Sequence, residues 1–157
     1  MNHSLIKHRA IIRWLFLLIA VLLASCTTMP VNDNPINALA EQYKQLRARQ
    51  QALPAGVFDK ELSGSGGKLE TVLAELGKQL GKPDYSQEYI IRLMGQPDEI
   101  MTAGDYQPAT LGRDEHAGII PPHETRLVYY WRGIHDYLYF ISKEGIIQSA
   151  YWYAAGE

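Results

Sequence analysis

The chain has 157 residues, the size of one ordinary domain. Its 46% apolar and 20% charged residues are typical of a globular rather than a disordered protein. Without the first 25 residues it keeps 12 basic and 17 acidic side chains, a net charge of −5. We therefore expect no nucleic-acid partner, because phosphate binding needs clustered Lys and Arg. One cysteine excludes an intramolecular disulfide and a zinc site of several thiolates.

Residues 1–25 have the layout of an export signal. Three basic side chains in residues 7–13 are followed by an apolar run over 14–24, which is 11 residues long. This run is well short of the ~20 residues that a helix needs to span a bilayer. Small residues then precede the only cysteine, Cys26.

The segment Leu23-Ala24-Ser25-Cys26 resembles the lipobox of bacterial lipoproteins. The resemblance implies cleavage before Cys26 and lipidation of that cysteine, so that the mature chain binds a membrane through its lipid. Several acyl chains anchor a protein stably, whereas one binds only marginally. Thr27 after the cysteine resembles sorting to the outer membrane, facing the periplasm. An uncleaved signal anchor or an ordinary buried cysteine is the alternative.

Residues 26–34 are predicted to be a lipidated tether, and 35–66 an additional helix with a Gly/Ser linker. Asn34 is expected to cap a helix over 35–53, whose apolar positions have heptad-like spacing. This narrow apolar stripe packs either on its own domain or on a partner helix. The glycines at 64–67 lack the spacing of a phosphate-binding loop, so we interpret them as a linker.

Two further helices are predicted at the start of the remaining domain, 67–157. Residues 68–80 place Leu and Val at i, i+3, i+4, i+7 and i+11, which is one continuous apolar face. Gly81 stands where a left-handed C-terminal cap belongs. A shorter helix is expected over 86–94, with Asp84 as its cap.

Strands are predicted for the rest of the chain. A short strand over 99–102 precedes the Gly- and Pro-rich segment 103–124, which we expect to be functional or disordered. Three segments rich in aromatic and β-branched residues follow, over 125–131, 137–142 and 146–153. Their short connections predict an α+β fold with two to three N-terminal helices packed on one face of a three- to four-stranded antiparallel meander sheet.

Motifs over 68–153 resemble the SmpA/OmlA (BamE-like) family of small outer-membrane lipoproteins. They are Gly81, the run Leu-Met-Gly-Gln-Pro-Asp at 93–98, and the aromatic strand Tyr-Tyr-Trp at 129–131. The helix over 35–53 and the length of 103–124 are additional to the family pattern. The resemblance implies a periplasm-facing scaffold that supports outer-membrane protein assembly or envelope integrity through protein and lipid contact, without catalysis or cofactor.

No pattern predicts a catalytic or metal site. No two of His116, His123 and His135 are four residues apart on a predicted helix, as a zincin-type pair requires. Carboxylates such as Asp114 and Glu115 have no partner for acid–base catalysis that the sequence fixes. We therefore expect no catalytic residue, no metal and no cofactor.

Nine of the 16 aromatic side chains lie between residues 125 and 153. Strand alternation places Tyr129 and Trp131 on one face and Arg126, Tyr130 and Arg132 on the other. We interpret the arginines as marking a solvent-facing surface. Leu138 and Phe140 are expected against the helices, and the buried face of the last strand stays open.

This expected outer face supplies the candidate partner-binding residues, which are Tyr130, Arg132, Tyr137, Tyr139 and Tyr151. Tyr and Arg are enriched at binding hot spots and also suit a lipid headgroup zone. Tyrosines also simply populate half-exposed sheets, so docking is a hypothesis.

Two functions are compatible with these features. One is a scaffold bound to an envelope protein partner such as an outer-membrane assembly complex. The alternative is an immunity or inhibitor lipoprotein that binds and blocks a secreted toxic enzyme, because a net-acidic domain with the long segment 103–124 is suited to occupying a cleft.

Overall fold

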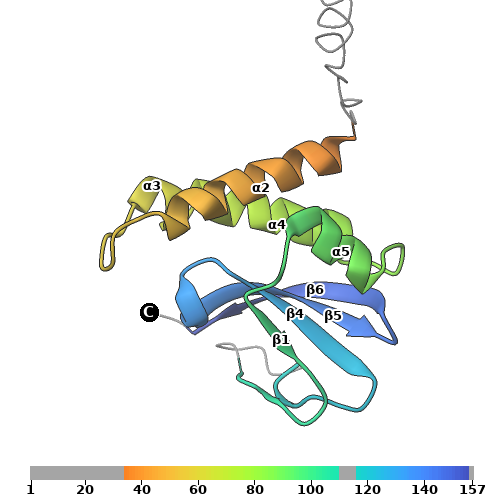
Figure 1. The fold of residues 1–157 in the computed structure, drawn as a ribbon. Helices are drawn as coiled ribbons and strands as arrows, with labels where there is room; N and C mark the ends of the chain where they lie inside the picture. Colours follow the sequence, from red (N-terminus) through yellow and green to blue (C-terminus); the bar gives the residue numbers. More distant parts are fainter. Residues whose placement is uncertain (1–33, 110–115, 156–157) are drawn as a thin grey trace, which may run out of the picture. The chain divides into compact units, whose positions relative to one another are not determined.

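The computed structural model describes residues 34–109 and 116–155. The expected export signal, Cys26 and the tether up to residue 33 lie outside the described residues, as do Asp114 and Glu115. Helices come first and the main sheet follows, which confirms the predicted α+β class (Figure 1). The helices are α2 (Pro35–Gln51), α3 (Lys60–Ser63), α4 (Lys68–Leu80) and α5 (Gln87–Met94). The strands are β1 (Glu99–Met101), β2 (Tyr106–Gln107), β3 (Gly118–Ile119), β4 (Glu124–Tyr130), β5 (Asp136–Lys143) and β6 (Ile146–Ala154).

The main sheet has four antiparallel strands in the order β1-β4-β5-β6. β4 pairs with β5 over its whole length, from Glu124 opposite Lys143 to Tyr130 opposite Tyr137. A 3-10 turn, Gly133–His135, connects them, and β5 and β6 form a hairpin with a register shift between Ile141 and Ser142. β2 and β3 form a separate two-stranded ribbon.

Helix α2 has the predicted N-terminal cap and packs on its own domain, which was one of the two predicted alternatives. The side chain of Asn34 accepts a hydrogen bond from the Ile36 amide at 3.1 Å, so the predicted cap is confirmed. Ala40 and Tyr43 of α2 are fully buried among α4, α5 and β4, so α2 packs on its own domain. The sequence-based division at residue 67 therefore does not coincide with a break in the core.

Polar contacts fix α2 to the connection between α5 and β1. The Arg47 guanidinium donates to the Gln96 carbonyl at 2.7 Å and to one Asp98 carboxylate oxygen at 2.5 Å. The other Asp98 oxygen accepts from the Tyr130 amide at 2.8 Å. The run at 93–98 thus connects the first helix to the central strand β4, which the family resemblance alone does not explain.

Two predicted caps differ from the structure for physical reasons that involve β6: Gly81 ends α4 as predicted but without the left-handed conformation, and the cap of α5 is a different residue. Gly81 has φ −77° rather than a left-handed φ, and a Cβ there would stand 2.6 Å from the Ala150 Cβ and 2.7 Å from the Ala150 amide nitrogen. Its lack of a side chain is needed for close approach to β6. Ser86, not Asp84, caps α5 by accepting from the Tyr89 amide at 3.1 Å. Ser86 is held there because it also pairs with Ile146 of β6.

Among residues 34–109 and 116–155, no helix has both the length and the apolar character that crossing a membrane requires.

Candidate binding surface

The face of the sheet that meets the helices is the predicted one. Leu127, Tyr129, Leu138 and Phe140 are buried against α2, α4 and α5, which confirms their expected side. The sequence left β6 undecided, and the structure places Trp152 on this same face beside Ala150. Alternation along the strands therefore fixed one side of the sheet correctly.

The opposite face carries the candidate tyrosines, and the structure brings four of them together. Ring centroids are 5.9 Å apart for Tyr130 and Tyr137, 6.1 Å for Tyr137 and Tyr139, and 5.9 Å for Tyr139 and Tyr151. Tyr153 of β6, which was not among the candidates, stacks on Tyr137 at 4.7 Å. We call these five side chains the tyrosine face.

The expectation that this face is solvent-exposed is wrong. Tyr137 and Tyr139 are only 5% and 4% exposed, whereas Tyr130 and Tyr151 are half-buried. Met101 and Ile120, which flank the long segment's ribbon, pack on these rings in a second apolar cluster. The described parts of that segment therefore cover the tyrosine face. A partner can reach Tyr137 and Tyr139 only if these covering residues move away.

The expectation that Arg126 faces solvent is wrong, because its side chain is buried in an ion pair with Glu124. Its Nε and Nη2 donate to one carboxylate oxygen of Glu124 at 3.0 Å and 2.8 Å, and both residues are buried. Its Nη1 donates to the His116 carbonyl at 2.7 Å, and its guanidinium lies 5.6 Å from the Tyr139 ring centre. The Arg126 side chain thus attaches the end of the long segment to β4.

Arg132, the fifth candidate, lies apart from the tyrosine face. Its guanidinium lies 4.4 Å from the centre of a Trp131 ring, on the helix side of the sheet, and its Nε donates to Asp136 at 2.8 Å. The structure therefore does not bring Arg132 together with the four candidate tyrosines.

The long segment folds into a ribbon that its own backbone holds. The Gly104 amide donates to the Ile120 carbonyl at 3.0 Å, and the Ile120 amide donates to the Asp105 carbonyl at 2.9 Å. Gly104 has φ +93°, a conformation that side chains disfavour. From inside the ribbon, buried Gln107 donates through Nε2 to the Tyr137 hydroxyl at 2.8 Å. The described parts of the segment 103–124 therefore contain regular structure and are not irregular throughout.

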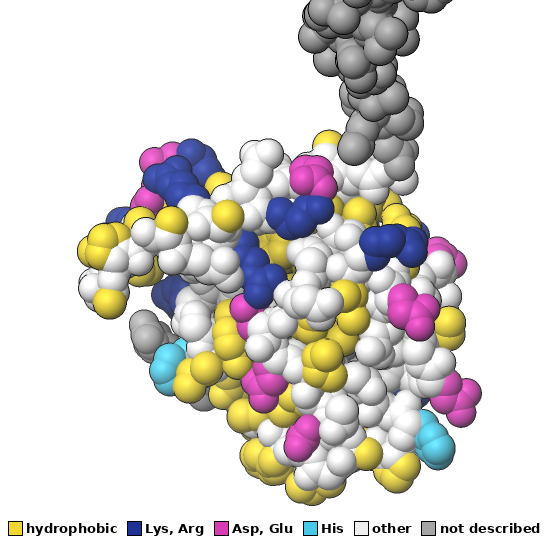
Figure 2. All heavy atoms as spheres, viewed as in Figure 1, with side chains coloured by type: hydrophobic (Ala, Val, Ile, Leu, Met, Phe, Trp, Pro, Cys, Tyr) yellow, Lys and Arg dark blue, Asp and Glu magenta, His cyan; other side chains and the backbone are white. Residues whose placement is uncertain are grey.

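The outer side of the ribbon exposes two large apolar side chains. Tyr106 and Ile119 stand opposite each other in the β2–β3 pairing and are 62% and 67% exposed. Hydrophobic side chains gather at this end of the molecule in the lower part of Figure 2. The sequence analysis missed this pair, although Tyr106-Gln107 and Ile119-Ile120 each alternate one exposed and one buried residue.

Burial raises the pKa of two phenols of the tyrosine face, Tyr130 and Tyr137. Desolvation raises the pKa of Tyr137 to about 12, against the lowering effect of its hydrogen bond with Gln107. Desolvation also raises the pKa of Tyr130 to about 12, assisted by its hydrogen bond to the Glu99 carboxylate at 2.7 Å. These side chains therefore act as neutral aromatic and hydrogen-bonding groups over the ordinary pH range.

The three histidines that the structure describes lie in different surroundings. The His116 ring lies 4.0 Å from the Tyr151 ring centre, while His123 and His135 are exposed on separate turns. In the part of the chain that the structure describes, no three His, Cys, Asp or Glu side chains are grouped so that they could hold a metal ion.

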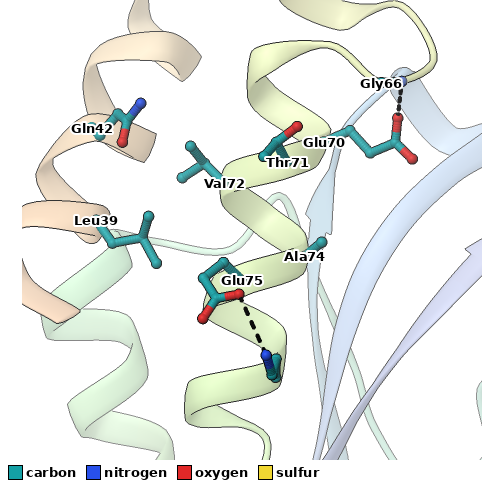
Figure 3. A pocket seen from close by; sticks show the side chains of 9 residues that line it. Leu39, Gln42, Gly66, Glu70, Thr71, Val72, Ala74 and Glu75 are labelled. Atoms are coloured by element: carbon teal, nitrogen blue, oxygen red, sulfur yellow. Dashed lines mark hydrogen bonds and ion pairs between the residues drawn. The ribbon is translucent and has the colours of Figure 1, made fainter. Parts of the chain in front are cut away.

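A groove of about 630 Å³ lies between α2 and α4 on the helix side (Figure 3). Leu39 and Val72 form part of its apolar lining, with Glu70 and Glu75 beside them. Both carboxylates have partners from their own neighbourhood: Glu70 accepts from the Gly66 amide at 2.6 Å, and Glu75 accepts from Gln79 at 2.7 Å. Both carboxylates at the groove are thus hydrogen-bonded within the protein.

Comparison with known proteins gives no match: no family model, curated protein or solved structure is significantly similar to this chain. The resemblance to the SmpA/OmlA family therefore stays a prediction from motif order.

Proposed function

We propose that this chain is a lipoprotein of the bacterial cell envelope, anchored to the outer membrane through Cys26 and facing the periplasm. There it acts as a non-catalytic scaffold or binding module in outer-membrane protein assembly or envelope integrity. The observation that carries the proposal is the lipobox-like run Leu23-Ala24-Ser25-Cys26 a few residues before a folded α+β domain.

The short spacer limits where the domain can work. Helix α2 begins at Pro35, so eight residues, 27–34, separate Cys26 from the fold. A fully extended chain spans at most about 3.5 Å per residue, which gives a reach of roughly 28 Å. A lipid on Cys26 would therefore keep the domain at the membrane surface, where an assembly scaffold has to act.

The ribbon supplies a surface suited to binding a protein. Tyr106 and Ile119 project from a backbone that hydrogen bonds and the buried Gln107 side chain hold in place. A preorganised aromatic and aliphatic pair loses little conformational entropy on binding, which favours its use as an anchor. Half-buried Tyr130 and Tyr151 extend the same side of the sheet.

The anchor is tested by labelling cells with radioactive palmitate. The wild-type chain should incorporate the label and fractionate with the outer membrane, while Cys26→Ser should do neither. Cys26→Ser tests the lipid, because position 26 precedes the first residue of the described fold. Unlabelled wild-type chain, or a Cys26→Ser variant that still fractionates with the outer membrane, would contradict the proposal.

The alternative, an inhibitor of a secreted enzyme, is favoured by the charge around the ribbon. Glu99 and Asp105, next to the ribbon in the chain, are exposed acidic residues. An acidic protrusion with an apolar tip complements a basic cleft. Crosslinking of the tagged, lipidated protein in intact cells separates the two functions: assembly components support the scaffold, and a single secreted enzyme supports the inhibitor.

A further inference from the structure

The turn between α2 and α3 exposes an unbroken apolar stretch. All five residues from Pro54 to Phe58 are exposed and none has a polar side chain. Val57 is 52% exposed and Phe58 62%. The turn lies at the end of the helix layer on the left of Figure 1, where Figure 2 shows hydrophobic side chains at the surface. We call residues 54–58 the apolar turn.

Hydrogen bonds and an ion pair hold the apolar turn in shape. The Val57 amide donates to the Pro54 carbonyl at 3.0 Å. At its base, Arg49 of α2 pairs with Asp59 at 2.6 Å, and Asp59 also caps α3 by accepting from the Leu62 amide at 3.1 Å. Phe58 is therefore exposed on a turn that hydrogen bonds and an ion pair hold closed.

The charge around the apolar turn favours an anionic surface. Arg49 is paired with Asp59, and Lys68 is paired with Glu61, so these four charges offset one another. The exposed Lys60 beside the turn then leaves a net positive charge. An apolar stretch next to a cation is the pattern of a segment that enters the interface of a bilayer with anionic lipids.

The net charges of the helix half and the sheet half of the chain also favour an approach of the helix layer to an anionic bilayer. Residues 34–98, which contain the helices, carry eight basic and eight acidic side chains, whereas residues 99–157 carry four basic and eight acidic ones. An anionic bilayer would repel the sheet half and tolerate the helix half. The apolar turn belongs to the helix layer, on the other side of the sheet from the ribbon (Figure 1).

We propose that the apolar turn inserts into the headgroup region of the bilayer to which the lipid holds the chain. This inference rests on the proposed lipid anchor. Helix α2 has 17 residues and is about 25 Å long, with the tether at its first residue and the apolar turn after its last. Two attachments at opposite ends of one helix lay it along the membrane and point the ribbon toward the periplasm.

The lipid makes even a weak insertion effective. Because the anchor holds the turn close to the bilayer, insertion becomes an intramolecular step with a high effective concentration. A protein pocket would have to supply its own affinity, and the turn offers such a pocket no side-chain hydrogen bond. The structure thus favours lipid over protein as the occupant.

An environment-sensitive dye at Ala55 tests the insertion. The lipidated Ala55→Cys chain, whose Cys26 thiol is blocked by the lipid, is labelled with nitrobenzoxadiazole and reconstituted in phosphatidylethanolamine vesicles containing phosphatidylglycerol. Ala103→Cys, an exposed alanine in the segment that carries the ribbon, is the matched control. We expect blue-shifted emission and quenching by brominated acyl chains at position 55, and water-like, unquenched emission at position 103.

Phe58→Asp added to Ala55→Cys sharpens the test. The side chain is exposed, so circular dichroism should show an unchanged fold, while the blue shift and the quenching should be lost. Emission at position 55 that equals that at position 103, or a blue shift without lipid quenching, would overturn the insertion. Mass spectrometry of the N-terminal peptide scores lipidation separately, so loss of the anchor and loss of insertion are distinguished.

Discussion

The two faces of the four-stranded sheet are buried in different ways. On one face, α2, α4 and α5 cover an apolar core whose largest members include Tyr43, Tyr129 and Phe140. On the other, the β2–β3 ribbon and its flanks cover tyrosines through apolar contacts of Ile120 and through hydrogen bonds of Arg126 and Gln107. The helix face holds the larger apolar core, whereas the second face joins the sheet to the exposed ribbon.

The largest loss of stability is expected when the buried ion pair of the second face is broken. Arg126→Met leaves the Glu124 carboxylate buried without its cation, so the free energy of unfolding should fall by about 3–5 kcal/mol. The double variant Glu124→Gln with Arg126→Met removes both charges and should recover most of the loss. Urea unfolding measures all three proteins. If the double variant were as unstable as Arg126→Met alone, the ion pair would not be the cause.

On the helix face, removal of side-chain volume from the apolar core should lower the free energy of unfolding. Leu76 of α4 is fully buried in the core, so Leu76→Ala should lower the free energy of unfolding by about 2–5 kcal/mol. Its exposed helix neighbour Lys78 supplies the control, since Lys78→Ala should change stability by less than about 0.5 kcal/mol. Similar losses for the two variants would show that α4 does not pack as described.

These faces also differ in what the sequence could predict. The leucine spacing fixed α4 from Lys68 to Leu80, and alternation along the strands assigned Phe140 correctly, because a buried face demands regular apolar periodicity. Nothing local predicts that the described parts of the segment 103–124 return to cover the tyrosines. The Glu-x-Arg spacing at 124–126 did place both charges on one face and could have suggested the ion pair.

The contact between α4 and the sheet can be tested at Gly77 and Gly81, two glycines at the C-terminal end of α4. Gly81→Ala would place a Cβ against the Ala150 backbone and should cost about 1–3 kcal/mol of stability. Gly77→Ala meets only the flexible Leu138 side-chain end at 2.8 Å, and alanine is the better helix former, so its effect should be smaller. Thermal unfolding ranks the variants, and a reversed order would contradict the close approach of α4 to β6.

The smallest expected effect is a pH dependence of the tyrosine face. The folded pKa of Tyr137, about 12, lies above its ordinary value of 10.0, so folding favours the protonated phenol. The stability from this group is present below pH 10 and is lost as the pH rises from 10 toward 12. Tyr137→Phe should therefore lose less stability over that interval than the wild type in urea unfolding. An equal loss in both proteins would mean that Tyr137 is not protected by the ribbon.

The most direct test of the central claim is photocrosslinking from the ribbon in intact cells. A photoreactive amino acid at Ile119 should capture the same protein partner reproducibly from lipidated chain, whereas one at the exposed Glu88 of α5 should capture none. The Cys26→Ser variant should lose the Ile119 product, because the domain would no longer be held at the membrane. A partner captured equally from both positions, or no product from Ile119, would contradict a membrane-held binding module that acts through its ribbon.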